Sequence, residues 1–371
     1  MEFRRINDLP PYVFATVDQL KRELRRDGRD VIDLGFGNPD IPSPPVAVEK
    51  LAEAAMRPVN HRYSSSRGLP NLRQAVCERY AKVFGVELDP DKHVVSSPAY
   101  PIHLVAPRLA GATVVHARIE NGDVLTGLEE ALEVAEPAPR VMIASFPHNP
   151  TTAIATPELM QRLVDLAREH EFILVHDFAY ADVSFDGHVP PSMLQADGAL
   201  DCAVELYSLT KSFSMAGWRV GFTVGRPDVV AALAKIKSYL DYGTFQPIQI
   251  ASIVALREAA DYPAEVCEIY RGRRDALISG LGRAGWHVDP PKGTMFVWAP
   301  IPERYAELGS LEYALKLARE ADVAVSPGIG FGPGGDGHVR FALVENEQRI
   351  GQAVAGLRRA LPELATERLA R

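Results

Sequence analysis

The stretch SLTKSFSMAGWRVGF, residues 208–222, sets one lysine, Lys211, among hydroxyl-bearing residues and between two apolar segments. The apolar run 203–206 precedes it, and a second apolar segment follows. Transfer of an ammonium group out of water is strongly unfavourable, so a lysine at the mouth of a buried strand is paired, solvated or kept for chemistry. Taken alone, Lys211 is best explained as a solvated strand end, and the rest of the chain must decide.

Apolar runs and helical periods alternate along the chain on both sides of this stretch. Apolar VMIAS (141–145), FILVHD (172–177) and WRVGFTVG (218–225) alternate with the helical patterns 156–170 and 226–240. Near-continuous apolar strands separated by helices indicate a mostly parallel sheet with helices on both faces. The predicted fold class is therefore α/β.

Polar residues that could take part in binding or catalysis follow the predicted strands. Asn149 comes after strand 141–145, Asp177 closes strand 172–175, and Ser208 and Lys211 follow strand 203–206. Ligands of such sheets bind beyond the carboxyl ends of the strands. We therefore expect these side chains to face one crevice.

The C-terminal part has a different pattern. A long helix at 264–283 leads into HVDPPKGTMFVWAPI (287–301), which predicts two short strands around a Pro-Gly turn. A helix at 310–319, a glycine-rich loop at 326–337, a strand at 338–344 and a last amphipathic helix follow. We predict an N-terminal arm (1–44) that belongs to a small domain, a large domain (45–268) and a small C-terminal α+β domain (269–371).

Composition narrows the possible partners to small molecules. The formal net charge is −8 with dispersed basic residues, which argues against binding to nucleic acid or to a membrane surface. The three cysteines form no CxxC pair, so we expect neither a disulfide framework nor a metal site. The first residues lack the apolar core of a signal peptide, and no window reaches membrane-spanning length. We expect a cytoplasmic protein.

Pyridoxal phosphate has a ring nitrogen, a phenolate and a phosphate that a protein must bind. The predicted strand ends offer matching side chains: a lysine, a carboxylate, an amide, a tyrosine and an arginine. The motifs SFPHNPT (145–151), HDFAYAD (176–182), SLTKSFSMAGWRVGF and GHVRFALVE (337–345) resemble, in order and spacing, the fold-type I, class I/II aminotransferases that use this cofactor. The alanine-pyruvate and diaminopimelate-like branch is the most similar. The resemblance runs from DLGFGNPD (33–40) to the last helix.

The resemblance implies an aminotransferase that moves an amino group between an amino acid, alanine- or glutamate-like, and a 2-oxo acid. Lys211 is implied to form the Schiff base with pyridoxal phosphate and to shuttle the substrate proton. Asp177 is implied to pair with the ring nitrogen, and Asn149 and Tyr180 with the phenolate oxygen. In isolation, Asp177 reads as a loop cap and Asn149 as a turn residue.

Further roles follow from the same resemblance. Ser208 and Arg219 are implied to hold the phosphate, and Tyr100 to stack on the cofactor ring. Tyr63 is implied to reach the phosphate of a neighbouring subunit, which makes the active unit a homodimer. Three residues are implied to serve the substrate: Arg340 clamps its carboxylate, Gly37 lets the backbone approach it, and Asn149 contacts it as well as the phenolate oxygen.

One junction departs from the family pattern. Relatives have a glycine-containing loop, a helix and a strand between a strand like 93–96 and a segment like PAYPIH (98–103), whereas here Ser97 runs directly into Pro98. The absent helix N-terminus would face the phosphate. We therefore expect weak cofactor binding. Two alternatives stay open: a pyridoxal-phosphate-dependent lyase of the same fold, and a cofactor-poor pseudoenzyme scaffold.

Overall fold

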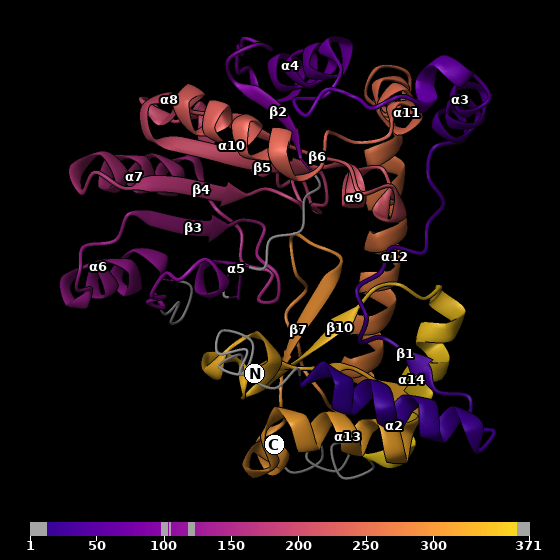
Figure 1. The fold of residues 1–371 in the computed structure, drawn as a ribbon. Coiled ribbons are helices and arrows are strands. Elements are labelled where there is room, and N and C mark those ends of the chain that lie inside the picture. Colours follow the sequence, from indigo (N-terminus) through magenta and orange to yellow (C-terminus); the bar gives the residue numbers. More distant parts are fainter. Residues whose placement is uncertain (1–12, 98–102, 104, 118–122, 362–371) are drawn as a thin grey trace, which may run out of the picture. The chain divides into compact units, whose positions relative to one another are not determined.

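The computed structural model describes residues 13–97, 103, 105–117 and 123–361 (Figure 1). The chain divides into two compact units. The large unit contains residues 41–147 and 154–266, and the small unit contains residues 1–40, 148–153 and 267–371. The boundary lies inside helix α12 (Tyr262–Arg283), so one continuous helix contributes residues to both units.

The large unit is built on a five-stranded sheet with the order β2-β6-β5-β4-β3. Its strands are β2 (Val94–Ser97), β3 (Val141–Ser145), β4 (Ile173–Asp177), β5 (Ala203–Ser208) and β6 (Gly221–Gly225). The pairs β3–β4 and β4–β5 are parallel, whereas β6 runs antiparallel to both of its neighbours. The predicted mostly parallel α/β sheet is therefore confirmed, with β6 as the reversed strand.

Helices cover both faces of this sheet because successive strand residues point to opposite sides. Val204 of β5 packs with Val95 and with Val230 of α10, whereas the next residue, Glu205, bonds to Tyr80 of α4 on the other face. The helices of this unit are α3 (Pro45–Ala55), η1 (Pro58–His61), α4 (Pro70–Phe84), α5 (Val105–Leu109), α6 (Val124–Val134), α7 (Pro157–Glu169), η2 (Met193–Gln195), α8 (Ala199–Cys202), α9 (Leu209–Ser212), η3 (Ala216–Trp218), α10 (Pro227–Leu240) and α11 (Gln246–Glu258).

Local sequence signals explain where several helices begin and end. Helix α7 begins after Thr156, whose side chain accepts a hydrogen bond from the amide of Leu159, and Pro157 occupies the first turn. Helix α4 also has a proline in its first turn and ends at Gly85, which adopts a left-handed conformation with φ 66°. These boundaries agree with the predicted helical periods.

The small unit combines short strands with three helices. Strand β10 pairs antiparallel with β7 and β9, and β1 pairs parallel with β8. Helices α2 and α14 pack with α13, together with the C-terminal part of α12. The elements are α2 (Phe14–Arg26), β1 (Ile32–Asp33), β7 (Phe296–Pro300), η4 (Glu303–Leu308), α13 (Gly309–Ala321), β8 (Val323–Ala324), β9 (Ser326–Pro327), η5 (Gly328–Phe331), η6 (Pro333–Gly335), β10 (His338–Ala342) and α14 (Glu347–Ala360).

Two sequence-based boundaries were wrong. Residues 287–291 form no strand, so the segment 287–301 supplies β7 alone. Pro290 and Pro291 lack amide protons and cannot donate to a strand ladder. Strand β5 extends to Ser208, two residues beyond the predicted end, because Ser208 pairs with Gly221 of β6.

Among the described helices, none combines the length and apolarity needed to cross a membrane. Cys77 and Cys202 are buried, and Cys267 is half-buried.

Candidate active site

The carboxyl ends of β4 and β5 bring three predicted residues to one edge of the large sheet. Asp177 is the last residue of β4, Ser208 is the last residue of β5, and Lys211 lies in the four-residue helix α9 that follows directly. The two strands are parallel neighbours, and Asp177 pairs with Leu206, two residues before the end of β5. The strand register thus places a carboxylate and a lysine on adjacent strand ends.

Asp177 is buried, and both of its carboxylate oxygens have partners. Oδ1 accepts a hydrogen bond from the amide of Ala179 at 3.1 Å, and Oδ2 lies 2.9 Å from Nε2 of His103. Because a carboxylate accepts, this ring nitrogen of His103 donates. Sequence reasoning missed His103, although it stands three residues after Tyr100 in the motif PAYPIH. Tyr100 itself lies outside the described residues.

Lys211 and Tyr180 are close neighbours at the same edge. The Nζ atom of Lys211 lies 6.0 Å from the centroid of the Tyr180 ring. Lys211 is half-buried, and Tyr180 is buried in the loop after β4. An aromatic face at this distance attracts the ammonium form of a lysine and restricts where its side chain can lie.

The predicted phosphate-holding residues flank the start of β6. Ser208 caps α9 by accepting from the amide of Thr210 at 3.1 Å, and its hydroxyl donates to the carbonyl of Val220 at 3.3 Å. Arg219, two residues before β6, is exposed and has a left-handed backbone with φ 56°. Its Nη1 donates to the carbonyl of Ala216 at 3.0 Å.

The donor set fits an anionic group at this position. The buried Oγ1 atom of Thr210 has no hydrogen-bond partner among the described residues, although it neighbours Lys211 and lies between Ser208 and Arg219 in the chain. A buried hydroxyl without an acceptor is unfavourable unless a ligand supplies one. A lysine, an arginine and hydroxyl donors beside a buried carboxylate match the phosphate, the carbonyl carbon and the ring nitrogen of pyridoxal phosphate.

A buried polar network supports this sheet edge from one face. Glu205 of β5 accepts from the hydroxyl of Tyr80 at 2.6 Å and the amide of Met193 at 2.8 Å, and it lies 2.8 Å from Nδ1 of His176. His176 directly precedes Asp177, and its Nε2 lies 3.1 Å from the carbonyl of Phe146. Burial is the main cause that raises the pKa of Tyr80 well above its ordinary value, and the negative charge of Glu205 adds to it. The Tyr80 hydroxyl therefore stays protonated and donates.

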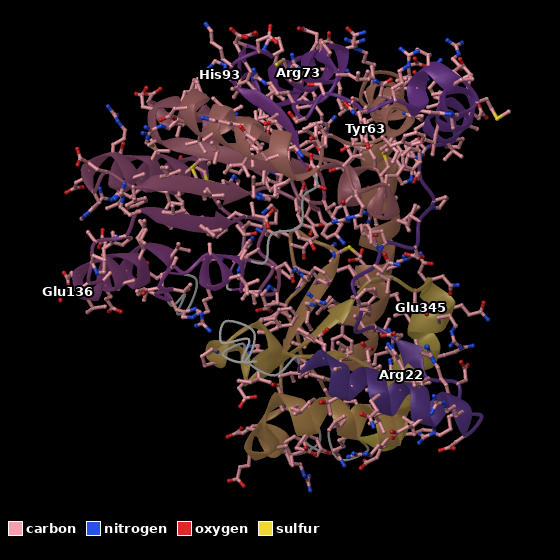
Figure 2. The ribbon with its side chains drawn as sticks, in the orientation of Figure 1. Arg22, Tyr63, Arg73, His93, Glu136 and Glu345 are labelled. Atoms are coloured by element: carbon pink, nitrogen blue, oxygen red, sulfur yellow. The ribbon has the colours of Figure 1, made fainter. Side chains whose placement is uncertain are left out.

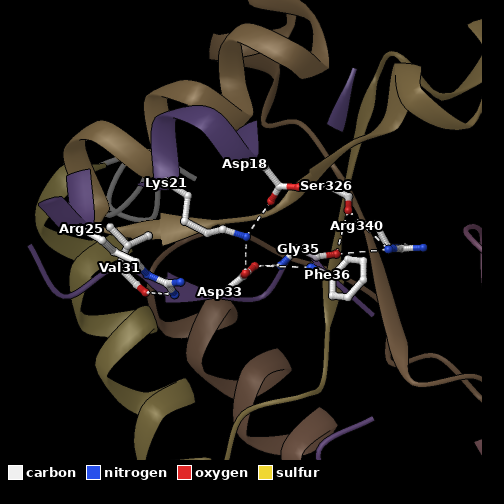
Figure 3. A network of polar contacts seen from close by, with 9 residues as sticks. All are labelled: Asp18, Lys21, Arg25, Val31, Asp33, Gly35, Phe36, Ser326 and Arg340. Carbon is white, nitrogen blue, oxygen red and sulfur yellow. Dashed lines mark hydrogen bonds and ion pairs between the residues drawn. The ribbon is translucent and has the colours of Figure 1, made fainter. Parts of the chain in front are cut away.

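The small unit gathers the predicted substrate-binding residues. Arg340 of β10 is buried, and its Nη1 donates to Oδ1 of Asn149 at 2.6 Å. Its Nη2 donates to the carbonyl of Gly35 at 3.2 Å (Figure 3). The guanidinium carbon lies 3.9 Å from the Phe296 ring centroid and 4.5 Å from that of Phe331. Two aromatic rings therefore lie against the guanidinium.

Gly37 makes room for one of these rings. A Cβ atom on Gly37 would lie 2.6 Å from Cε1 and 2.7 Å from Cζ of Phe296. Because Phe296 stacks against Arg340, a larger residue at position 37 would displace the ring and with it the guanidinium. The prediction that the backbone approaches the substrate at Gly37 stays a prediction.

Tyr63 is an exposed residue of the large unit. Its side chain is 89% exposed (Figure 2), and its ring centroid is 5.4 Å from that of Tyr242, which lies between α10 and α11. Within the part of the chain that the structure describes, no cluster of His, Cys, Asp and Glu side chains could hold a metal ion.

Comparisons with known proteins point to one family. The model of the family described as "Aminotransferase class I and II" matches residues 29–98 and 84–357. The chain is 47% identical to the glutamate-pyruvate aminotransferase AlaC of Escherichia coli K12, covering 96% of this chain and 93% of that protein. It is 38% identical to the LL-diaminopimelate aminotransferase of Moorella thermoacetica, covering 97% and 98%. A mutant aspartate aminotransferase of Thermus thermophilus superimposes with a TM-score of 0.89 at 25% identity, covering 97% and 100%.

The same alignments bear on the short junction after Ser97. They run over 382 and 387 positions, more than the 371 residues of this chain, so the relatives contain residues that this chain lacks. The first stretch matched by the family model ends at Pro98. Neither observation places those extra residues, because the second matched stretch runs across the junction, so the segment missing between Ser97 and Pro98 stays a prediction.

Proposed function

We propose, from the premise that this chain belongs to the class I and II aminotransferases, that it transfers an amino group between an alanine- or glutamate-like amino acid and a 2-oxo acid. Family membership confirms the predicted fold type I, the aminotransferase class and the use of pyridoxal phosphate. Of the alternatives, the lyase and the pseudoenzyme scaffold are not favoured, because the named relatives are aminotransferases.

One observation carries the proposal: the half-buried Lys211 and the buried Asp177 stand at the carboxyl ends of adjacent parallel strands. When bound, pyridoxal phosphate supplies the electron sink for the electron pair left on the substrate carbon. The Asp177 carboxylate, held by His103 and by the Ala179 amide, keeps a proton at the ring nitrogen. Lys211 Nζ takes the proton from the substrate carbon and returns it.

The remaining residues bind and orient the cofactor and the substrate. Arg219 would hold the phosphate with guanidinium donors and Thr210 with its hydroxyl, which has no acceptor among the described residues, and Ser208 would join them by turning its hydroxyl from the Val220 carbonyl to the phosphate. Arg340, packed against Phe296 and Phe331, binds the substrate carboxylate. For Tyr100 and Tyr180 we keep the predicted contacts with the cofactor ring and the phenolate oxygen, and for Asn149 the predicted contact with that oxygen and the substrate.

The identity of the amino donor is tested directly. Cofactor-loaded protein is incubated with L-alanine and 2-oxoglutarate, and pyruvate and glutamate are separated and quantified. We expect the two products in equal amounts. A parallel incubation with an S-substituted cysteine tests the lyase, because its β-carbon carries a thiol leaving group: release of thiol, pyruvate and ammonia without a new amino acid would show the lyase reaction instead. The absence of all these products and of a bound-cofactor absorbance band would show a scaffold.

We also propose that the active unit is a cytoplasmic homodimer in which Tyr63 serves the neighbouring subunit. An exposed apolar patch supports this proposal, because patches of this kind mark protein interfaces. Tyr63 and Tyr242 are in ring contact, and further exposed apolar residues lie nearby in the chain, on η1, at the end of α10 and before α11: Val59, Ile236, Tyr239, Leu240 and Phe245. Sedimentation tests it: Tyr239→Asp should shift the protein from dimer to monomer, and an unchanged dimer would contradict the assignment of this patch.

A further inference from the structure

A chain of contacts leads from the N-terminal helix α2 to Arg340. We propose that Lys21 and Asp33 are positioning residues for substrate binding, which act by fixing the turn at Gly35 whose carbonyl holds the Arg340 guanidinium (Figure 3). The proposal rests on the proposed function, in which Arg340 binds the substrate carboxylate. All of these residues belong to the small unit.

The first link joins α2 to strand β1. Lys21 Nζ lies 2.6 Å from Asp18 Oδ1 and 2.5 Å from Asp33 Oδ2. The lysine side chain is 12% exposed and that of Asp33 is 20% exposed, so this ion pair is shielded from most of the solvent. Burial disfavours the charged lysine, but the hydrogen bonds to Asp18 and Asp33 outweigh it and raise the pKa of Lys21. Lys21 is therefore a cation at neutral pH.

The second link is a turn built on the other carboxylate oxygen. Asp33 Oδ1 accepts from the amide of Gly35 at 3.0 Å and from the amide of Phe36 at 3.4 Å. An aspartate that bonds to amides two and three residues ahead stabilises a turn. Because Lys21 holds Oδ2, the Asp33 side chain has little freedom to release these amides.

The third link is the Gly35 carbonyl. It accepts from Ser326 Oγ at 2.8 Å and from Arg340 Nη2 at 3.2 Å. The position of this carbonyl depends on the turn that Asp33 holds. The rings of Phe296 and Phe331 pack against the guanidinium, and its rotation is set by its hydrogen-bond partners. Gly35 and Ser326 on Nη2, with Asn149 on Nη1, set that rotation.

A carboxylate that binds in the guanidinium plane requires this rotation to be correct. Loosening the turn should therefore weaken carboxylate binding while leaving the residues of the large unit, which hold the cofactor, unchanged. Lys21 and Asp33 act through Arg340 and touch no substrate, so the expected signature is a rise in KM for substrates that carry the carboxylate.

The test compares Lys21→Met and Asp33→Ala with the wild type, all loaded with pyridoxal phosphate. We expect the dissociation constant of propionate, the alanine skeleton without its amino group, to rise about three- to tenfold in calorimetric titration, the size expected for one lost hydrogen bond. KM for alanine should rise by a similar factor with kcat nearly unchanged. The slow reaction with ethylamine, which lacks a carboxylate, should not change.

Further variants separate the possible explanations. Lys21→Arg should restore propionate affinity, and Asp33→Asn should lose less than Asp33→Ala because its amide oxygen still accepts from the turn. Lys316→Met, which breaks an ion pair with Glu320 on α13 of the same unit, is the control and should behave as wild type. Circular dichroism melts establish that each variant is folded.

Arg340→Lys is the reference for the proposed function. If it weakens propionate binding while Lys21→Met and Asp33→Ala, both folded, bind as tightly as wild type, the relay is wrong and the proposed role of Arg340 stands. If Arg340→Lys also binds propionate normally, the proposed role of Arg340 fails, and the relay fails with it.

Discussion

At the scale of single residues, the site depends on charged groups held by partners distant in sequence. Asp177 meets His103, 74 residues earlier, and Arg340 meets Asn149, 191 residues earlier. A carboxylate with two donors is fixed in orientation, and a guanidinium packed against two rings is restricted in position. The residues to which we assign contacts with cofactor and substrate are thus pre-organised by neighbours for which we propose no reaction.

Lys211→Ala should abolish transamination and leave the fold intact. The change removes the amine that binds the cofactor and moves the proton, and it empties no core because Lys211 is half-buried. The loss of kcat should exceed about a thousandfold, with the free energy of unfolding changed by less than about 1 kcal/mol. Stopped-flow kinetics measures kcat, and denaturant titration measures the free energy of unfolding. Substantial multiple-turnover activity of the variant would show that Lys211 does not have the proposed role.

Asp177→Asn should also lose most of its activity while it keeps its fold. The neutral amide no longer stabilises a proton on the ring nitrogen, although it can still accept from the Ala179 amide. We expect kcat to fall by more than about a hundredfold. Turnover at the wild-type rate with cofactor bound, measured on the same preparation, would identify Asp177 as a structural residue.

At the scale of elements, a buried network joins α4, β4, β5 and η2. Glu205 of β5 accepts hydrogen bonds from the hydroxyl of Tyr80, the hydroxyl of Ser192 and the amide of Met193. It also contacts the ring of His176 of β4. A fully buried carboxylate is tolerated because these partners replace its water. The network holds together the two strands whose ends carry Asp177 and Lys211.

Tyr80→Phe should therefore destabilise the fold by about 1–3 kcal/mol, because a buried carboxylate loses one of its donors. Tyr313→Phe is a matched control: Tyr313 is also fully buried, but its hydroxyl has no hydrogen-bond partner among the described residues. Urea denaturation of both variants provides the comparison. Equal stability of Tyr80→Phe and wild type would show that the Glu205 network contributes little.

At the scale of the whole molecule, we predict that a segment is missing after Ser97, and its loss would affect the sheet and the cofactor site together. Strand β3 forms one edge of the five-stranded sheet, and Val141 and Ile143 on it are exposed. The short helix α9 carries Lys211 and is capped by Ser208. It lies next to the predicted phosphate position. We therefore expect side chains, rather than the amides of a helix N-terminus, to make most of the contacts with the phosphate.

Pyridoxal phosphate should accordingly bind weakly, so that the protein is purified largely without it. Loss of a helix dipole, about 0.3–2 kcal/mol, and of two hydrogen bonds to a charged group, about 1.5–3 kcal/mol each, predicts a dissociation constant raised by roughly two to six powers of ten. Fluorescence titration of apoprotein measures it. A submicromolar constant would mean that other residues replace the missing helix.

The sequence by itself determined the elements and the chemistry. The apolar runs defined β3, β4 and β6 to within a few residues, and the motifs around Lys211, Asp177 and Arg340 identified the family, because these patterns depend on local residue types and spacing. The two adjacent prolines at 290–291 already argue locally against a strand at 287–291, whereas the extension of β5 to Ser208 depends on its pairing with Gly221 of β6.

Tertiary structure alone decided which side chains meet. The partnership of His103 with Asp177, the reversed direction of β6, the ring of Phe296 against Gly37 and the relay from Lys21 to Arg340 all depend on strand register and on packing between segments far apart in the chain. A hydrogen bond between such segments is specified by where the backbone places its donor and acceptor. That placement is fixed when the sheet and the core form, and no local stretch of sequence contains it.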